Sequence, residues 1–235
     1  MKNGRLKITF LAVLIVALFQ FGVILCMAPI GQVGADDIDY YNVNLETLEK
    51  ISNNSTELNK VKVIRDVQHN ANLSSSAYNR VKQQLGYISR CPNVTSVDIG
   101  IKGLTVDSSD MNGWRSANGI SVGILDGTVD FSGVSNTNIT NILLYNCDIQ
   151  NCNGASNLVN LNTFSATGVN GFSVINFENM KNLDTVNLND LKIDNYATLC
   201  THLVNVENVS LGGNLRNSDT KYLTNLKKLK TLSLK

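Results

Sequence analysis

The sequence has few of the side chains on which most enzyme chemistry depends. Its two histidines, His69 and His202, are far apart in the chain, and charged residues make up only 17% of it. No Ser/His/Asp arrangement, glycine-rich phosphate loop or cluster of metal-ligand residues is visible. We therefore predict that the protein is not an enzyme. We expect no catalytic, cofactor-binding or metal-binding residue and no cofactor.

An excess of positive charge is also missing. The chain has 20 basic and 19 acidic side chains, but Lys2, Arg5 and Lys7 lie within the first 35 residues, which contain no acid. The rest of the chain has 17 basic and 19 acidic side chains, a formal charge of −2. A surface that follows the phosphates of a nucleic acid needs excess positive charge, so we predict no nucleic-acid partner.

Apolar residues, in contrast, make up 43% of the chain, which is enough for a folded domain with a real core. The sequence is rich in asparagine and has two prolines in 235 residues. We attribute the asparagine content to an AT-rich genome and draw no mechanism from it.

The first 35 residues have the layout of a secretory signal. A basic start is followed by an apolar run over residues 8–27, and the small residues Val33, Gly34 and Ala35 come directly before Asp36. The run has about 20 residues, which is long enough to span a bilayer if it is not removed. We predict a signal peptide or a signal anchor over residues 1–35, with membrane contact only through residues 8–27 if they are uncleaved. Both alternatives place the remaining chain outside the cytoplasm, either secreted or at the cell surface.

The strongest pattern is an internal repeat of 22–23 residues. One apolar position recurs with steps of 23, 22, 22, 22, 23 and 23 residues, in the series Val97, Ile120, Ile142, Phe164, Val186, Val209 and Leu232. The copies match the leucine-rich-repeat pattern L-x-x-L-x-L-x-x-N/C-x-L, with Cys147 and Asn214 at the Asn/Cys position. The sequence therefore predicts an α/β solenoid: a leucine-rich-repeat horseshoe with a parallel concave β-sheet and 3₁₀ or extended segments on its convex side.

Residues 36–90 are predicted to form a helical N-terminal cap that includes a long first repeat. Segments 44–51 and 75–88 have apolar residues at helical spacing, and Leu58, Val61 and Val63 repeat the strand pattern. Such a cap covers the first edge of a solenoid. The repeats are assigned to residues 91–235. They end at Lys235 inside the last predicted strand, so the C-terminal cap is missing. We expect a truncated chain, with oligomerisation as the alternative.

Two segments resemble the repeats of bacterial internalins: Tyr222 to Leu234 and Met180 to Ile193. The order of signal sequence, helical cap and 22-residue repeats is also similar to that family. The resemblance implies a bacterial surface or secreted protein that binds a partner on the concave face of the horseshoe. The sequence departs from the family in having no immunoglobulin-like segment after the repeats, no Leu-Pro-x-Thr-Gly sorting motif and no cell-wall-binding module.

Outside the signal there are four cysteines, Cys91, Cys147, Cys152 and Cys200. An even number in an exported chain is compatible with disulfides. A stack of repeats does not require such links, however, and Cys147 has an inward position. We predict buried thiols, with a bridge between Cys147 and Cys152 as the exception.

Residues that flank the inward pair of each repeat are expected to project from the concave sheet. Most are small and polar, whereas Leu143 and Tyr145 would place an aromatic and an aliphatic side chain together in solvent. The alternative is that both only pack across neighbouring strands. The predicted partner-binding residues are Asp98, Leu143, Tyr145, Thr163, Thr185, Asn187 and Asn189.

From these observations we predict an exported protein that mediates protein–protein adhesion or recognition, with a protein or glycan ligand on its concave face. The alternatives are a membrane-anchored structural or regulatory surface component and a truncated fragment of a larger internalin-like protein.

Overall fold

The computed structural model describes residues 38–68 and 73–234. The predicted signal segment and His69 lie outside the described residues. Within the described ranges, no helix combines the length and the apolar character that crossing a bilayer requires.

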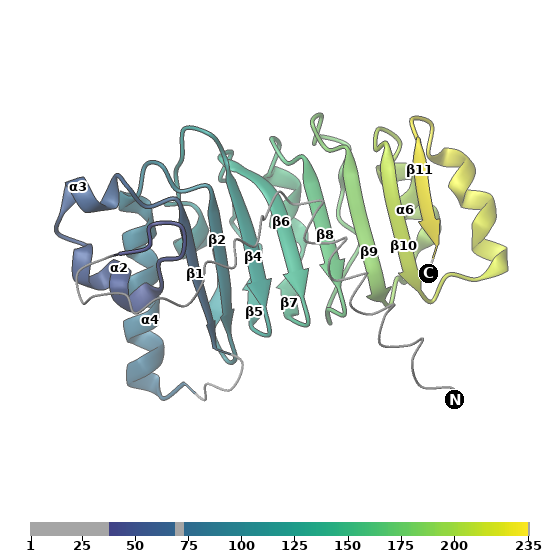
Figure 1. The fold of residues 1–235 in the computed structure, drawn as a ribbon. Helices are drawn as coiled ribbons and strands as arrows, with labels where there is room; N and C mark the ends of the chain where they lie inside the picture. Colours follow the sequence, from purple (N-terminus) through teal and green to yellow (C-terminus); the bar gives the residue numbers. More distant parts are fainter. Residues whose placement is uncertain (1–37, 69–72, 235) are drawn as a thin grey trace, which may run out of the picture. The chain divides into compact units, whose positions relative to one another are not determined.

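Eight parallel strands form the main sheet, and they lie side by side in the order in which they occur in the chain (Figure 1). They are β1 (Val63–Gln68), β2 (Ser96–Ile101), β4 (Ile120–Leu125), β6 (Ile139–Tyr145), β8 (Thr163–Thr167), β9 (Thr185–Leu191), β10 (Asn208–Gly213) and β11 (Thr231–Leu234). A smaller parallel sheet contains β3 (Thr105–Val106), β5 (Thr128–Asp130) and β7 (Asp148–Asn151). Each turn of the chain thus adds one rung beside the previous rung, as in the predicted solenoid with a parallel sheet.

Helices occupy the two N-terminal segments with helical spacing. Helix α2 (Leu45–Ile51) buries its three apolar residues and begins after Asn44, whose side chain accepts a hydrogen bond from the Thr47 amide. The short helix α3 (Ser55–Leu58) follows it, and α4 (Ser75–Tyr87) continues into the 3₁₀ turn η1 (Ile88–Arg90). Glu49 joins α2 to α4 through an ion pair with Arg80 at 2.8 Å.

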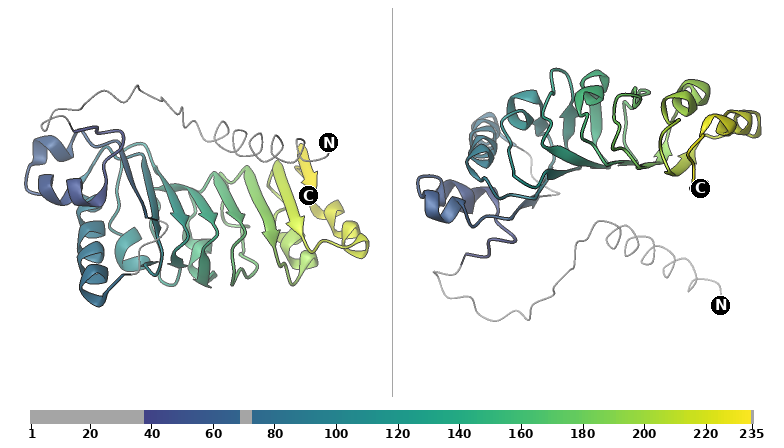
Figure 2. Two further views of the ribbon diagram at one scale, coloured as in Figure 1. Left: turned by 60° about the horizontal axis from the view of Figure 1, so that its bottom comes forward. Right: turned by 90° about the horizontal axis from the view of Figure 1, so that it is seen from above.

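The connections between later strands are of mixed type. The short α-helix α5 (Ser108–Met111) follows β3, and the 3₁₀ segments η2 (Asn153–Asn157) and η3 (Asn217–Asn225) occur in later rungs. Between β9 and β10 the chain forms α6 (Tyr196–His202), an α-helix of seven residues. Helices α4, α5 and α6 lie on one side of the main sheet (Figure 2). The prediction of only 3₁₀ and extended segments was therefore wrong for α5 and α6, whose polar N-cap residues Asp107 and Asn195 start regular helices.

In the predicted series from Val97 to Leu232, the alignment of inward residues is correct in every rung except that of β4. Val97 aligns with Val122, not with Ile120, and Val122 aligns with Ile142. Ile120 pairs with Ile139, and the register shifts directly after it. The steps here are thus 25 and 20 residues instead of 23 and 22. From Ile142 onward the predicted series is confirmed through Leu232.

The first strand also differs from its prediction. Val61 precedes β1, and Ile64 aligns with Val97. The next inward position is occupied by Asp66, which is only 7% exposed and aligns with Ile99. Its carboxylate accepts hydrogen bonds from the Leu45 amide at 3.1 Å and from the Gln68 side chain at 2.7 Å. An acid at an inward position breaks the apolar alternation, and for that reason the sequence pattern misplaced this strand.

Asparagine side chains link consecutive rungs, a role that composition did not reveal. Asn136 is buried, and its amide nitrogen donates to the carbonyl oxygens of Met111 and Trp114 in the preceding rung, at 2.5 and 2.6 Å. Asn112 instead donates to the Gly133 carbonyl oxygen in the following rung. Other side chains that bond to the backbone of the preceding rung are those of Asn93, Asn157, Asn160, Asn208 and Asn214. The asparagine content therefore has a structural use, because an amide can both donate and accept where the stacked backbones leave polar groups unpaired.

The four described cysteines are free thiols, and all are buried. The structure thus has no bridge between Cys147 and Cys152, and the prediction of buried thiols is confirmed. The Cys152 sulfur accepts a hydrogen bond from the Ser173 amide at 3.3 Å, which places it against the next rung.

Candidate binding face of the main sheet

One face of the main sheet is formed by the side chains that alternate with the buried ones, and we call it the sheet face. It lies opposite the helices α4, α5 and α6 (Figure 2). Because the strands are parallel and in register, these side chains form three columns that run across the strands. The strand register therefore determines which side chains are neighbours on the sheet face, whether or not a partner is bound.

All seven predicted contact residues have sheet-face positions. Thr163 and Thr185 are adjacent in one column, and Asn187 lies in the middle column. Tyr145 and Asn189 share the third column with Thr167 between them, about 10 Å apart. The structure thus brings Tyr145, Asn187 and Asn189 to one face, but strand β8 separates the tyrosine from the asparagines.

Asp98 is engaged within the protein. Its carboxylate accepts from the Arg65 guanidinium, with distances of 3.0 Å to Nη2 and 3.3 Å to Nε. Burial raises the pKa of Asp98, and the hydrogen bonds from Arg65 oppose this shift. A β-carbon added at Gly123 would lie 2.5 Å from Asp98 Oδ1, so glycine leaves the space that the carboxylate fills. Asp98 is therefore part of an internal ion pair at one end of the sheet face.

An apolar patch lies near the carboxyl ends of the first strands and consists of Val67, Leu125, Leu143 and Tyr145. Register places Leu125 beside Tyr145, and Tyr145 is 44% exposed. Between Val67 and Leu125 lies Gly100, where an added β-carbon would be 2.8 Å from Val67 Cγ1 and 3.2 Å from Leu125 Cβ. The two aliphatic side chains thus close over the glycine and continue the apolar surface to Tyr145.

Sequence reasoning missed two members of this patch. With Ile120 as the inward residue, the predicted phase places Gly119, Ser121 and Gly123 on this face, whereas the observed row is Ser121, Gly123 and Leu125. The two-residue register error removed Leu125 from the predicted face. Val67 was missed because the first strand had been placed too early. A search over every candidate phase of each strand would have included both among its candidates, but only the pairing between strands selects the correct phase.

The remaining sheet face is polar and uncharged. From β4 to β11 none of the described sheet-face residues is acidic or basic. Asn189 Oδ1 accepts from Ser210 Oγ at 2.9 Å, so part of its hydrogen-bonding capacity is used inside the protein. The only aromatic side chain among the described sheet-face residues is Tyr145. A partner would therefore contact the apolar patch and the neutral hydroxyl and amide groups that surround it.

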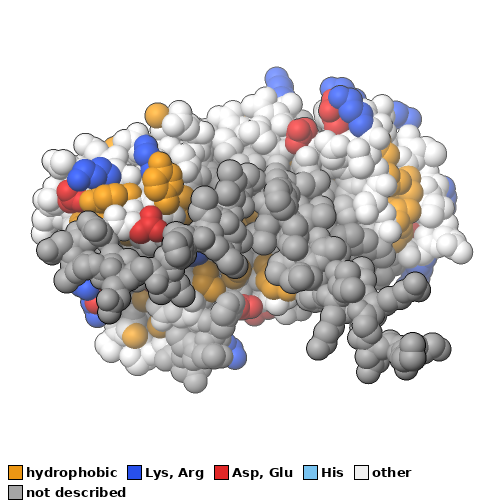
Figure 3. Space-filling model, viewed as in Figure 1, with side chains coloured by type: hydrophobic (Ala, Val, Ile, Leu, Met, Phe, Trp, Pro, Cys, Tyr) orange, Lys and Arg blue, Asp and Glu red, His pale blue; other side chains and the backbone are white. Residues whose placement is uncertain are grey.

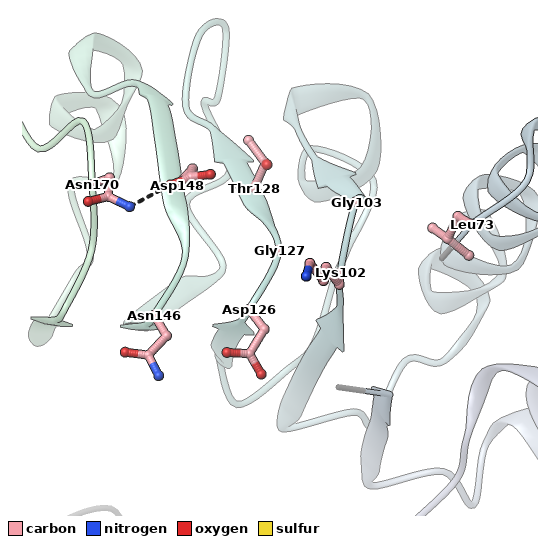
Figure 4. Close-up of a pocket in the computed structure, with 9 residues that line it drawn as sticks. All are labelled: Leu73, Lys102, Gly103, Asp126, Gly127, Thr128, Asn146, Asp148 and Asn170. Atoms are coloured by element: carbon pink, nitrogen blue, oxygen red, sulfur yellow. Dashed lines mark hydrogen bonds between the residues drawn. The ribbon is translucent and has the colours of Figure 1, made fainter. Parts of the chain in front are cut away.

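A shallow polar groove lies where the strands end, beside the sheet face (Figure 4). It is lined in part by Lys102, Asp126, Asn146, Asp148 and Asn170, and Asn170 donates to Asp148 at 2.9 Å. The described residues contain no group of three or more His, Cys, Asp or Glu side chains that could hold a metal ion. Outside the groove, His202 Nδ1 lies 3.0 Å from the Ile175 carbonyl oxygen, at the end of α6.

Comparison with known proteins yields structural similarity but no similarity in sequence. No protein-family model matches the chain, and no curated protein matches its sequence. The fold is similar to the crystal structure of internalin C2 from Listeria monocytogenes, with 16% sequence identity and a TM-score of 0.44. The alignment covers 81% of this chain and 92% of that chain. The assignment of a repeat solenoid rests on the strand register of this chain itself.

Proposed function

We propose that this is an exported leucine-rich-repeat protein that recognises another protein through its sheet face. The observation that carries the proposal is the apolar patch of Val67, Leu125, Leu143 and Tyr145, which places an exposed aromatic side chain on a rigid, in-register sheet. Binding energy at protein interfaces is concentrated in a few residues, among which tyrosine is enriched, and these are surrounded by weaker contacts that exclude water. The role is recognition or adhesion without chemistry.

A protein suits this face better than a glycan. The aliphatic side chains of Val67, Leu125 and Leu143 can bury apolar surface of a partner, whereas they offer no hydrogen bond to sugar hydroxyls. The neutral surroundings favour a partner surface with few charges, because a charge buried against uncharged groups loses hydration without gaining a counter-ion.

Mutation of the patch tests this proposal. The full-length chain is applied to arrays of cell-surface proteins and of glycans, and each ligand found is titrated. The double variant Tyr145→Ala with Leu143→Ser should weaken binding at least about tenfold, since both anchors are lost. Tyr41→Ala is the matched control, because Tyr41 is 71% exposed and lies before α2, outside the strands of the main sheet. Unchanged affinity of the double variant, or a ligand set made up of glycans only, would refute the proposal.

Export is the second part of the proposal and is tested separately. A secreted protein whose N-terminus is Asp36 supports a cleaved signal peptide, whereas a full-length pool in the membrane fraction supports a surface component anchored through residues 8–27. Retention of the full-length chain in the cytoplasm would contradict both forms of export.

A further inference from the structure

Four asparagines in the described residues are followed directly by glycine. The pairs are Asn112-Gly113, Asn118-Gly119, Asn153-Gly154 and Asn170-Gly171, and Asn3-Gly4 lies outside the described residues. Asparagine is a thermolabile residue, and a following glycine has no side chain to hinder attack of its backbone nitrogen on the asparagine amide. All four asparagines are exposed, and neutral polar side chains and backbone, drawn in white, cover much of the described surface in Figure 3. Exposure therefore does not distinguish the four pairs, whereas their hydrogen bonds do.

Asn112 is held at both ends of its side-chain amide. Its Nδ2 donates to the Gly133 carbonyl oxygen at 2.9 Å, and its Oδ1 accepts from the Ser135 amide at 2.8 Å. The Gly113 amide, whose nitrogen would have to attack, donates to the Asp110 carbonyl oxygen at 3.3 Å. All of these bonds must open before the nitrogen can reach the side chain, so this pair should react only during local unfolding.

Asn153 and Asn170 are held by the carbonyl group that precedes each glycine. The Asn153 carbonyl oxygen accepts from Ser156 Oγ at 2.9 Å within η2, and the Asn170 carbonyl oxygen accepts from the Ile149 amide at 2.9 Å. The Asn170 side chain also donates to Asp148, again at 2.9 Å. The glycine nitrogen can reach the side chain only if the peptide group between the two residues rotates, so these bonds oppose the reaction as well.

Asn118 lacks all of these restraints. Among the described residues, none forms a hydrogen bond with its side-chain amide or with the peptide group that joins it to Gly119. The first backbone bond after this pair runs from the Ile120 amide to the Asn138 carbonyl oxygen, at 2.8 Å. The glycine itself is required, because its φ is +81° and an added β-carbon would lie 2.6 Å from Thr140 Cγ2. The fold therefore needs the reactive pair of residues at this turn but does not restrain it as it restrains the other pairs.

We propose that the fold directs spontaneous deamidation to Asn118. The Gly119 nitrogen loses its proton and forms a bond to Asn118 Cγ, the bond from Cγ to Nδ2 breaks, and ammonia leaves with a proton in place of the one removed. Water then opens the resulting cyclic imide at either of its carbonyl carbons, which yields aspartate or isoaspartate. The product carries a negative charge at a position where the asparagine was neutral.

The site is separate from the apolar patch on the sheet face. Asn118 lies before the first residue of β4, whereas Leu125 lies at the carboxyl end of that strand. The proposal therefore does not depend on the proposed function. Because hydroxide removes the proton from the attacking nitrogen, the rate of deamidation should rise with pH. The converted fraction should grow with the time that the folded protein has existed, so it would record the age of the molecule.

Peptide mass spectrometry of the full-length chain after incubation in mildly alkaline buffer is the direct test. Deamidation at Asn118 should be at least about tenfold faster than at each of the other three described pairs, because those pairs must first break hydrogen bonds. The same incubation in concentrated urea removes the bonds of the folded state, so the four rates should become similar. This comparison within the unmodified chain tests the proposal without any variant.

Two variants identify the source of the product. Asn118→Gln should remove most of the isoaspartate that forms in the described part of the folded chain, because the longer side chain would have to close a larger ring. Asn170→Gln is the matched control, since Asn170 is also exposed and precedes a glycine, and it should leave the isoaspartate content unchanged.

Three results would overturn the proposal. The first is a rate at Asn118 no faster than at the other described pairs in the folded chain, and the second is an isoaspartate content that Asn118→Gln does not lower. The third is a preference for Asn118 that persists unchanged in urea, because the local sequence and not the fold would then be its cause.

Discussion

Replacement of Asn136 by leucine should destabilise the protein far more than the loss of an ordinary surface asparagine. Asn136 is only 6% exposed, and its side chain makes four hydrogen bonds. Its Nδ2 donates to the Met111 and Trp114 carbonyl oxygens, and its Oδ1 accepts from the backbone amide of Asn138 at 2.9 Å and from the side chain of Asn138 at 3.1 Å. Leucine has a similar size but no polar atom, so the cavity stays filled while the bonds are lost.

The size of the destabilisation depends on which hydrogen bonds the former partners of Asn136 retain. The Met111 carbonyl still accepts from the Trp114 amide at 3.2 Å, so it loses only one of two bonds. The Trp114 carbonyl and the Asn138 amide lose the partner that Asn136 provided. A buried polar group left without a partner costs about 1–3 kcal/mol, so we expect a total loss of about 3 kcal/mol in the free energy of unfolding.

Urea unfolding provides the assay. Trp114 is the single tryptophan and is fully buried beside the altered bonds, so its fluorescence reports on this rung, and circular dichroism reports on the whole sheet. A loss of about 3 kcal/mol should lower the urea midpoint by about 1–2 M. Asn160→Ala is the matched control, because its exposed Nδ2 bond to the Thr137 carbonyl has a length of 3.0 Å but can be replaced by water. If the two variants differed by less than about 0.5 kcal/mol, the stabilising role of the buried amide would be refuted.

Two further predictions concern the buried thiols and one tight turn. Burial raises the pKa of Cys91 and Cys147 from 9.0 to about 12 and that of Cys200 to about 11. The free energy of unfolding should therefore keep its full value below about pH 9 and fall as the pH rises toward 12, because the thiols of the unfolded chain ionise first. At about pH 10 each buried thiol should lower the free energy of unfolding by about 1 kcal/mol. In urea titrations, Cys147→Val should reduce this loss by the contribution of one thiol. Equal losses between about pH 8 and 10 in the variant and the unmodified chain would contradict this. Gly171→Ala should cost about 2 kcal/mol or more in thermal unfolding, because φ is +72° and the new β-carbon would lie 2.1 Å from the Ile149 carbonyl oxygen. Gly86→Ala in α4, with nothing within 4 Å, should instead be neutral or stabilising, and similar effects of the two changes would count against the steric argument.

The sequence predicted the inward residues of a strand correctly where the spacing of apolar residues fitted only one phase. From Ile142 to Leu232 a single alternating pair per rung gave the correct phase. In the third rung Ile120, Val122 and Ile124 are all apolar and buried, so a shift of two residues preserves the pattern and only strand pairing decides.

The prediction of the candidate site depended on strand phase in the same way. Its seven predicted residues reach the sheet face because alternation along a strand is local, but Val67 and Leu125 required knowledge of the register between strands. The bonds of Asn136 and its counterparts escaped prediction for another reason. Their acceptors are backbone carbonyls about one rung away, which are identical in every sequence and leave no signal there.

The agreement between chain order and strand order has a mechanical consequence. Because each rung pairs only with its immediate neighbours, tension applied along the chain cannot be shared by all eight strands at once. A pull on one end of the sheet should therefore release the strands one after another, with each step lengthening the chain by about one repeat. Under load the protein would then extend in a series of small steps, each of which dissipates part of the applied work. The rungs that are still in place would serve as the template on which released rungs refold.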